Sequence, residues 1–520
     1  MSGGSQRLRN WSSSLSWRPA DVWEPDSVGQ LGEMLTDALT AGRRVRPLGR
    51  KYSFSGAIVD DDVALDLHRL SDLSIATRGD ASSALGRALT EDAWRDPSTA
   101  GYALVGAGVS LDALCAAGAS RGVAPFVLGG SSGQTVIGAF STSTHGAAFD
   151  LPPLPDFVEG LYLLTGERQH WIERGRAGPL LDPAQLPALL GAPGGLITHR
   201  DRELFDAAVV SLGGIGVIAV ALIRLRDAHA LMNERLWPRR AWTKLRPALL
   251  SGDAFERPPV DGADGLPGKY RYLELIFDPY DRDETTAWVC TRHLVDAPGG
   301  DPSPALRGSP NLLKFARTIG TNFARYSKAL SVLVETSRLR GVDDAGEPLL
   351  YELTEVMNTG VPTSQPVWSF ELVWPAASED YLRFLDQALA LVRQKWAAGR
   401  PFMGLFTLRF SKSTTAHLAM QHDANPSARY AHVEISPLQD VFNNSSRLSD
   451  NNVEFLDAMF AIPTTREARL HWGQGDWSSL RFDARRYPRL ESWRKSARQL
   501  ADADGALFRS PFLEEAHVRF

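Results

Sequence analysis

The stretch from residue 129 to residue 146, GGSSGQTVIGAFSTSTHG, constrains this chain more than any other part of its sequence. Its glycines leave the backbone free to adopt left-handed conformations or to approach another group closely. The hydroxyl side chains between them lie beside many unhindered N–H groups. A run of donors with so little side-chain bulk suits a diphosphate. A glycine-rich surface loop is built from the same residue types, so the surroundings of the stretch must decide between the two.

The composition is that of an ordinary globular protein, with 43% hydrophobic and 22% charged residues. A length of 520 residues predicts two or three domains. The net charge of −5 gives no reason to expect nucleic acid or an anionic membrane as a partner. The polar N-terminus has no apolar leader and no apolar run is long enough to span a bilayer, so we expect a cytoplasmic protein without membrane contact.

Metal and disulfide chemistry find little support in the sequence. The two cysteines, Cys115 and Cys290, are too few for a disulfide scaffold or a cysteine-rich metal site, and both stand in apolar contexts typical of a core. No HExxH motif or comparable ligand spacing occurs. We therefore predict no metal site.

The N-terminal part reads as strands, glycine turns and helices. A helix is predicted over residues 21–44, with a start at Pro25-Asp26-Ser27, and strands over 45–48 and 63–67. The loop between these strands, residues 49–56, is a second phosphate-cradle candidate, because it is rich in glycine and serine and follows a strand directly. Neither GxGxxG nor the P-loop motif occurs in the chain.

Two further segments complete the N-terminal part. Residues 75–100 are polar and predict a surface insertion. LFDAAVVSLGGIGVIAVALIRLR predicts a helix, a glycine turn at 213–216 and a long buried strand.

The pattern of residue types changes near residue 228, where glycines become less frequent. From there to about residue 460, strands such as YRYLELIFDPY and VWSFELVWPA alternate with amphipathic helices such as SEDYLRFLDQALALVRQKWAAG. This pattern predicts an antiparallel sheet with helices packed on it, an α+β arrangement.

The order of these segments resembles the vanillyl-alcohol oxidase, or PCMH-type, family of FAD-binding oxidoreductases, and within it the aldonolactone and alditol oxidase branch. The N-terminal likeness lies in Asn10-Trp11, PLGRKYSFS, GGSSGQTVIGAFSTSTHG and LFDAAVVSLGGIGVIAVALIRL. The C-terminal likeness is thinner and lies in SFELVWP, FTLRF and RLHWGQ. The resemblance implies FAD as cofactor and an α+β fold. That fold has a two-subdomain FAD-binding domain (1–228), a substrate-binding cap domain with an antiparallel sheet (229–464) and a C-terminal segment that completes the FAD domain (465–520).

The resemblance also implies site residues. Glu371, Arg409, His145 and Gln474 are predicted to act in catalysis, with Glu371 and His145 as candidates for the base; Glu274 is a weaker candidate for a similar role. His471 and Trp472 are expected where the chain returns to the flavin. The residues predicted to contact FAD are Pro47, Gly49, Arg50, Lys51, Tyr52, Ser53, Gly129, Ser131, Ser132, Gly133, Gln134, Thr135, Gly138, Ser141, Thr144, His145, Gly146, Gly213, Gly216, Val217, Ile218 and His471.

Three positions depart from the pattern of these relatives. Tyr52 stands where many of them carry a histidine that tethers the flavin, so we predict non-covalent FAD. Gln474 replaces a lysine whose charge would stabilise the reduced flavin. Ala147 replaces a serine that is frequent in the sugar-oxidising branch. Together with the aromatic residues Trp368, Phe370 and Trp374 of the cap, this last change argues against a polyol.

The predicted function is an FAD-dependent oxidase. It removes a hydride from a C–OH or similar bond of a bulky, partly aromatic small molecule, in specialised metabolism, with O₂ as acceptor. Two alternatives stay open. One is an oxidative decarboxylase or desaturase of a natural-product carboxylic acid, whose carboxylate Arg409 would hold. The other is a flavin-binding protein without turnover.

Overall fold

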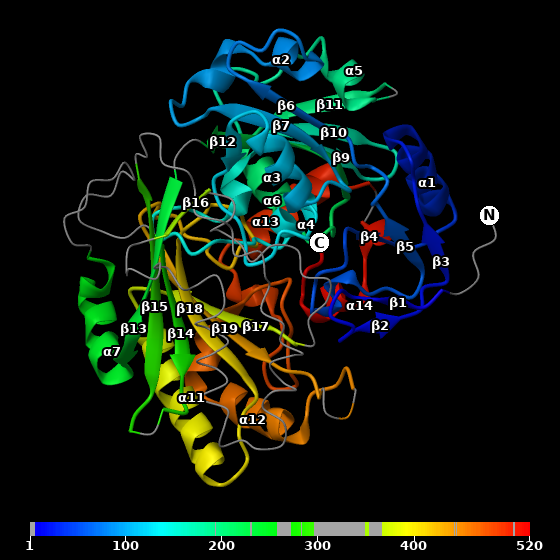
Figure 1. Ribbon diagram of the computed structural model, residues 1–520. Helices are drawn as coiled ribbons and strands as arrows, with labels where there is room; N and C mark the ends of the chain where they lie inside the picture. The colour runs from blue at the N-terminus through cyan, green and yellow to red at the C-terminus, as the bar shows by residue number, and fades with distance from the viewer. Residues whose placement is uncertain are drawn as a thin grey trace.

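A computed structural model of the chain describes residues 6–192, 194–228, 231–256, 272–281, 283–295, 349–352, 367–440, 443, 445–502 and 505–520. Figure 1 shows an N-terminal part, coloured from blue to green, beside a part built around one large sheet of green to orange strands. The C-terminal helices α13 (Leu490–Leu500) and α14 (Pro511–Glu515), in red, return to the N-terminal part. Among the described residues, no helix is long and apolar enough to cross a membrane.

The first N-terminal subdomain is a small parallel sheet in which β5 lies between β3 and β4. Helix α1 begins where the Ser27 hydroxyl accepts a hydrogen bond from the N–H of Gln30 at 3.3 Å, as the Pro25-Asp26-Ser27 sequence predicts. The strand predictions for this region are confirmed, but the helix predicted over residues 21–44 is shorter, because residues 21–23 form a strand instead. Its elements are β1 (Leu8–Arg9), β2 (Ser16–Trp17), β3 (Asp21–Trp23), α1 (Val28–Thr40), β4 (Val45–Leu48) and β5 (Val63–Asp66).

The second N-terminal subdomain is a sheet in the order β11-β10-β9-β12-β7-β6, with β8 paired to the far end of β12. β10 and β11 are parallel and the other neighbours are antiparallel. Its strands are β6 (Leu73–Thr77), β7 (Gly101–Gly106), β8 (Val123–Pro125), β9 (Val158–Leu164), β10 (Gln169–Glu173), β11 (Leu196–Arg200) and β12 (Val217–Asp227). Its helices are α2 (Ala84–Ala88), α3 (Leu111–Ala119), α4 (Val136–Ser141), α5 (Leu186–Leu190) and α6 (Arg202–Ala208).

The surface insertion predicted over residues 75–100 is only partly right. β6 enters that range and pairs with β7 inside the sheet, and Leu85, Ala88 and Ala93 are buried beneath it. The segment is mostly polar, so its sequence did not indicate that a few apolar side chains attach it to the core.

The large sheet is antiparallel throughout, in the order β16-β13-β15-β14-β18-β19-β17-β20. This confirms the predicted α+β cap on a two-subdomain N-terminal part. Its strands are β13 (Leu231–Ala241), β14 (Tyr272–Asp278), β15 (Thr286–Val295), β16 (Leu349–Glu352), β17 (Phe370–Pro375), β18 (Gly404–Lys412), β19 (Arg429–Pro437) and β20 (Arg469–Leu470). Its helices are α7 (Trp242–Ser251), α11 (Asp380–Ala397) and α12 (Asp450–Phe460).

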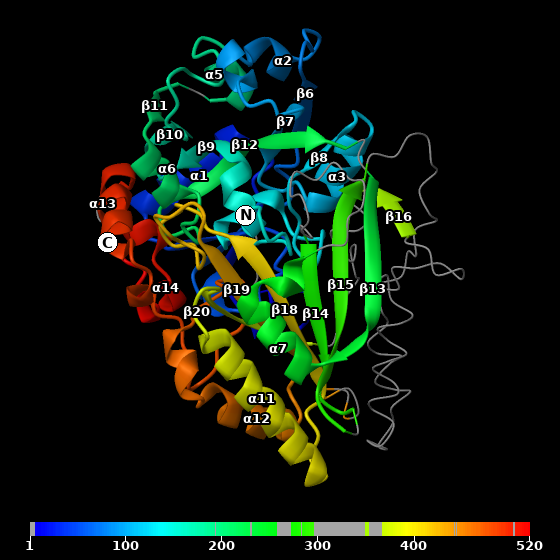
Figure 2. The same ribbon diagram turned by 90° about the vertical axis from the view of Figure 1, so that its left-hand side faces the viewer.

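Side chains along β18 separate the two faces of this sheet. Phe406, Leu408 and Phe410 alternate with Thr407 and Arg409, because successive side chains of a strand point to opposite faces. The apolar set packs under the helices: Phe406 contacts the α12 residue Phe455 and Phe410 contacts the α11 residue Tyr381. Figure 2 shows α7 in front of the strands, with α11 and α12 toward their lower ends. Thr407 and Arg409 therefore face the N-terminal part.

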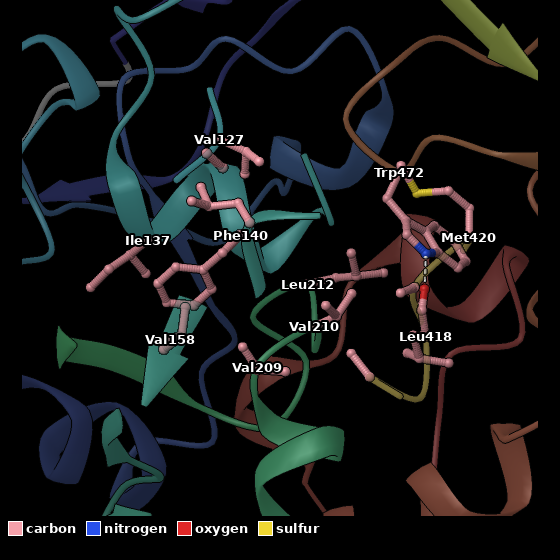
Figure 3. Packing of buried hydrophobic residues seen from close by; sticks show 14 of the residues in the cluster. Val127, Ile137, Phe140, Val158, Val209, Val210, Leu212, Leu418, Met420 and Trp472 are labelled. Atoms are coloured by element: carbon pink, nitrogen blue, oxygen red, sulfur yellow. Dashed lines mark hydrogen bonds between the residues drawn. The ribbon is translucent and has the colours of Figure 1, made fainter. Parts of the chain in front are cut away.

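The C-terminal segment joins both parts through a buried tryptophan. The indole N–H of Trp472 donates to the carbonyl oxygen of Leu418 at 2.6 Å, and the ring stacks on Tyr487 and Phe482. Figure 3 shows Trp472 with Leu418 and Met420, close to Val210 and Leu212 of the N-terminal core. The segments before and after Trp472 are thus fixed where they meet the cradle loops.

We expect Trp472→Phe to lower the free energy of unfolding by about 1–3 kcal/mol, because the Leu418 carbonyl would lose its donor in a fully buried place. Thermal unfolding followed by circular dichroism measures the loss. Trp368→Phe is the matched control, since its indole N–H also donates to a carbonyl, that of Ser446, but at a partly exposed position where water can replace the bond. Equal losses in the two variants would contradict the role given to the buried bond.

Candidate functional site

A cavity of about 440 Å³ lies between the N-terminal part and the inner face of the large sheet. Its size falls within the range of about 300–1,000 Å³ that is usual for small-molecule sites. The loops after β4 and before α4 form one side of it, and β17, β18 and β19 form the other. The segment of residues 471–474 closes the cavity from the C-terminal side.

The first cradle loop follows β4 and is held in a constrained conformation. Lys51 has a φ of 57°, a left-handed value that is uncommon for a residue with a side chain. Its ammonium group is bound by Asp66 at 2.7 Å, so the charge is already matched within the subdomain. Tyr52 follows and stacks on Trp11 with ring centroids 5.1 Å apart. Burial raises the pKa of Tyr52, although a hydrogen bond with Ser131 acts in the opposite direction.

The second cradle loop ends in helix α4, which Thr135 caps by accepting the N–H of Gly138 at 3.1 Å. The two loops touch at Gly49, where an added Cβ would lie 2.4 Å from the Thr135 hydroxyl. They touch again at Gly133, where a Cβ would lie 1.8 Å from the Tyr52 hydroxyl. A Cβ at either place would therefore force the facing Thr135 or Tyr52 side chain to shift.

A third segment approaches the cavity from the start of β12. Leu212 and Gly213 both have left-handed φ values, of 55° and 67°. A Cβ on Gly213 would lie 2.7 Å from the Pro47 ring. Strained non-glycine residues thus stand in the first and third cradle segments, and such strain is concentrated at ligand-binding sites.

Arg46 is a site residue that sequence reasoning missed. It is 4% exposed, lines the cavity, and donates through Nη2 to the carbonyl of Leu212. Its Nε and Nη1 have no hydrogen-bond partner among the described residues. Burial lowers the pKa of Arg46 to about 10, and Asp60 opposes this, so the guanidinium remains charged at neutral pH. The available signal was a charged residue inside the short apolar strand that leads into the first loop.

Most residues predicted to contact the cofactor line the cavity, but three do not. The Ser132 carbonyl accepts the N–H of Asp112, Gly133 lies beneath the Tyr52 ring, and the Gly146 carbonyl accepts a bond from His145. These three residues support the loop from behind. The predicted residues that line the cavity are Pro47, Gly49, Arg50, Lys51, Tyr52, Ser53, Gly129, Ser131, Gln134, Thr135, Gly138, Ser141, Thr144, His145, Gly213, Gly216, Val217, Ile218 and His471.

Two carboxylates face each other on the cap side of the cavity. Glu371 on β17 and Glu434 on β19 are directly opposite in register. Like charges at such positions repel unless a cation lies between them. Arg409 from β18 provides it: its Nη2 lies 2.5 Å from Glu434 Oε2 and 3.5 Å from Glu371 Oε2. Glu434 was not predicted, although the alternation in AHVEIS places it on one face with His432.

The second oxygen of Glu371 is bound by two imidazoles. Oε1 lies 2.8 Å from His145 Nε2, which comes from the N-terminal part, and 3.1 Å from His432 Nδ1 on β19. The two rings stack with centroids 3.6 Å apart. His145 Nδ1 faces the Gly146 carbonyl at 2.7 Å, and because a carbonyl can only accept, Nδ1 carries a proton. Nε2 is therefore the His145 nitrogen that lies against the Glu371 carboxylate.

The charges of this cluster set the protonation of its members. Burial raises the pKa of Glu371, but the charge of His145 and the hydrogen bonds from His145 and His432 outweigh it, so the pKa lies well below its usual value. Burial and the neighbouring His145 lower the pKa of His432 to about 3. Burial lowers the pKa of His471 to about 4, against the attraction of Glu371. At neutral pH, Glu371 is a carboxylate and His432 and His471 are neutral.

Three polar groups remain available at the cavity wall. Thr407 Oγ1, Gln474 Oε1 and Gln134 Oε1 are buried without a hydrogen-bond partner among the described residues. His471 Nδ1 accepts the N–H of Gly473 at 3.0 Å, which leaves the proton of its neutral ring on Nε2. Buried polar groups are nearly always bonded, so these atoms mark places where a ligand's polar groups would fit.

The aromatic residues expected at the substrate side lie elsewhere. Trp374 is fully buried and donates to the Thr464 carbonyl, while Trp368 stacks on Phe370. Trp472 and Glu274 are likewise outside the lining, which on the cap side consists of Val367, Ser369, Leu405, Thr407, Ser436 and the charged residues above.

His145, Glu371 and His432 also place possible metal-ligand atoms within 4.8 Å of one another. Hydrogen bonds already join these atoms, and the guanidinium of Arg409 lies against the same carboxylate. A further cation would have to overcome that positive charge. The absence of a metal stays a prediction.

Comparison with known proteins identifies the kind of domain to which the cradle loops belong. Residues 19–169 match the family described as FAD binding domain. The chain is 22% identical to an L-gulono-1,4-lactone dehydrogenase of Mycobacterium tuberculosis (strain ATCC 25618 / H37Rv), with 93% of this chain and 92% of that protein covered. It is 28% identical to a long-chain alcohol oxidase of an uncultured marine euryarchaeote over 52% of this chain and 46% of that protein. The alignment therefore spans less than half the length of that relative.

Solved structures show the same fold. A solvent-stable cholesterol oxidase has a TM-score of 0.68 with 15% identity, and 98% of this chain and 97% of that chain are covered. The resemblance inferred from the sequence is confirmed: the chain carries a PCMH-type FAD-binding domain, and its cofactor is FAD. The residues present fit this cofactor, because the glycine contacts keep the cradle free of bulk and Arg46 offers unpartnered cationic donors inside it.

We expect Arg46→Met to raise the dissociation constant of FAD by about 10–100-fold, the loss of one or two hydrogen bonds from a charged group. Titration of the apoprotein with FAD, followed by flavin fluorescence, measures it. Arg44→Met is the control, because Arg44 is partly exposed and bound by Asp60 and Asp61. Unchanged affinity in Arg46→Met would show that this guanidinium does not touch the cofactor.

We expect all FAD to leave the protein on acid precipitation, because Tyr52 occupies the place of the tethering histidine and packs against Trp11. The measurement compares the visible absorbance of pellet and supernatant. A yellow pellet, or flavin fluorescence on the protein band after SDS electrophoresis, would contradict a non-covalent cofactor.

Proposed function

We propose that this protein is an FAD-dependent oxidase that converts a C–OH group of a small-molecule substrate to a carbonyl, with O₂ as electron acceptor. The observation that carries the proposal is the position of Glu371 and Arg409. Both line the same cavity as the cradle of an FAD-binding domain, and both come from the inner face of the cap sheet. A carboxylate and a guanidinium at such a place can hold and deprotonate an alcohol.

The chemistry divides between cofactor and protein. The flavin, when bound, accepts the hydride that the carbinol carbon loses. The chain must orient the alcohol and take its proton. Glu371 Oε1 is occupied by two imidazoles, so Oε2 is the atom with acceptor capacity left. Arg409, beside Oε2, donates to the alcohol oxygen and stabilises the negative charge that develops there. His145 is a poor base because both of its nitrogens already face acceptors.

The charge balance of the site favours an alcohol over a carboxylic acid. Arg409 already lies between the carboxylates of Glu371 and Glu434. A substrate carboxylate would bring a third negative charge to one guanidinium, at a cost that grows as water is excluded. The oxidative decarboxylase alternative is therefore the weaker one. Simultaneous measurement of CO₂ and H₂O₂ release would reveal it.

The relatives support the substrate class in general terms. Their names include a long-chain alcohol oxidase and lactone oxidases and dehydrogenases. Our finer prediction, a bulky and partly aromatic molecule of specialised metabolism, loses its structural support among the described residues, since Trp368, Phe370 and Trp374 do not line the cavity. The unpartnered Thr407 and Gln474 at the wall favour a substrate with a second polar group.

A flavin-binding protein without turnover is the alternative of another class, motivated by Gln474 and Tyr52. The two are separated by anaerobic mixing of the purified protein with a panel of long-chain alcohols, polyols, aromatic alcohols and aldonolactones. Bleaching of the flavin absorbance by any member, followed by recovery with O₂, supports the oxidase. A flavin that stays yellow with the whole panel would count against it.

We expect Glu371→Gln to lower kcat by about 10²–10⁴-fold, the usual effect of removing a positioned base, while FAD is retained. The O₂ consumption rate of matched holoproteins measures the loss. Glu173→Gln is the control: Glu173 is also a buried carboxylate, bound by the Trp171 indole, but it lies on β10 outside the cavity lining. Comparable kcat values for Glu371→Gln and the unchanged protein would remove Glu371 from the role of base.

A further inference from the structure

The proposed reaction leaves two buried groups behind Glu371 without a role. His432 lies on β19 and Ser411 near the end of β18, and both are at most 1% exposed. Ser411 Oγ lies 2.9 Å from His432 Nε2, and His432 Nδ1 lies 3.1 Å from Glu371 Oε1. Serine, histidine and carboxylate thus stand in the order of a hydrolase triad. Ser411 and His432 lie outside the set of described residues that line the cavity.

The hydrogen bonds fix the position of the proton on His432. The neutral ring carries one proton, on Nδ1 or on Nε2. With the proton on Nε2, the lone pair of Nδ1 would face the Glu371 carboxylate, and the two would repel. With the proton on Nδ1, the ring donates to Glu371 and Nε2 accepts the Ser411 hydroxyl. The hydroxyl's other acceptor, the Lys412 carbonyl, lies farther away at 3.3 Å.

We propose that His432, whose Nε2 accepts the Ser411 hydroxyl, is a positioning residue that keeps the buried Glu371 side chain in its carboxylate form, facing the cavity through Oε2. The inference rests on the proposed function only in that Glu371 receives the proton of the alcohol. His432 itself touches neither substrate nor cofactor in this arrangement.

Burial of Glu371 is the effect that the His432 hydrogen bond opposes, together with His145. Glu371 is 1% exposed, and desolvation alone favours the protonated acid, which could not accept a proton. A hydrogen bond from a neutral imidazole stabilises the carboxylate without adding charge. The titratable and charged groups that face Glu371 are His145 from the loop after α4, Arg409 from β18, His432 and Glu434 from β19, and His471 from the C-terminal segment.

The test follows the ionisation of Glu371 itself, independent of any substrate. Holoprotein labelled with [δ-¹³C]glutamate is titrated from neutral pH downward to the acid limit of the folded state, with the Glu371 carboxyl signal assigned by its loss in Glu371→Gln. In the unchanged protein this group stays ionised down to below its ordinary pKa of 4.5. We expect His432→Leu to raise the pKa of Glu371 by about one to two pH units, the effect of losing one hydrogen bond to a charged group.

His432→Asn is the matched variant, because its side-chain amide can place an N–H near the position of Nδ1 while it has the same number and branching of side-chain heavy atoms as leucine. We expect its Glu371 titration to stay near that of the unchanged protein. Ser411→Ala, which removes one buried oxygen only, should give a smaller upward shift. It serves as the second measurement if His432→Leu does not fold. Once a substrate that the protein oxidises is known, the acidic limb of the pH profile of kcat/KM should shift in parallel with the pKa of Glu371.

The outcomes separate this inference from the proposed function. Equal titrations of Glu371 in the unchanged protein, His432→Leu and Ser411→Ala would overturn the positioning role. Equal shifts in His432→Leu and His432→Asn would also overturn it, because the ring would then matter only by filling space. If the shifts appear as expected but no alcohol bleaches the flavin, the proposed oxidation fails while the control of Glu371 by His432 stands.

Discussion

The juxtaposition of Glu371 and Glu434 across β17 and β19 is the interaction on which this site depends. Two carboxylates at directly opposed positions destabilise a sheet unless cations compensate them. One cation, Arg409, comes from the strand beside them, and the imidazole of His145 comes from the cradle loop of the N-terminal part. The charge balance of the cap sheet is therefore completed by a residue of the FAD-binding domain that packs against it.

The cradle loops do not depend on compensating charges. Their shape depends on glycines, whose lack of a side chain lets the two loops come into contact. Gly49 and Gly133 let the two loops touch Thr135 and Tyr52 at distances that no Cβ would allow. Lys51 and Leu212 hold left-handed conformations that cost free energy, which the packed surroundings must supply. What remains is a shell of backbone and small polar groups, with Arg46 as a buried cation whose unpartnered nitrogens suit an anionic or polar part of the cofactor.

The chemical consequence is that the charges lining the cavity on the cap side already compensate one another. A further charge from a substrate would be left without a partner. A buried carboxylate that stays ionised, a guanidinium between two acids, and a neutral His471 that presents Nε2–H together suit a neutral, hydroxyl-bearing substrate. Ion pairs buried in this way seldom add stability, because desolvation offsets the attraction. Their arrangement at the cavity is better explained by the chemistry it allows than by the stability of the fold.

The sequence by itself indicated a phosphate cradle and the α+β class, because glycine–hydroxyl loops after strands and the period of apolar residues are local properties that survive without knowledge of the fold. FAD and several of the residues that meet at the cavity, such as His145, Glu371 and Arg409, followed from the order of motifs that resembles the PCMH-type family. The sequence did not show that Glu434 opposes Glu371, that His432 binds the same carboxylate oxygen, or that Trp368 and Phe370 turn away from the cavity. Alternation along a strand assigns a residue to one of two faces, but the register between strands far apart in the chain, and the part that covers each face, are set only by tertiary packing. The tertiary structure therefore decided the charge pairs, the protonation of the buried histidines and the unpartnered donors of Arg46, since each depends on burial and on a neighbour distant in sequence.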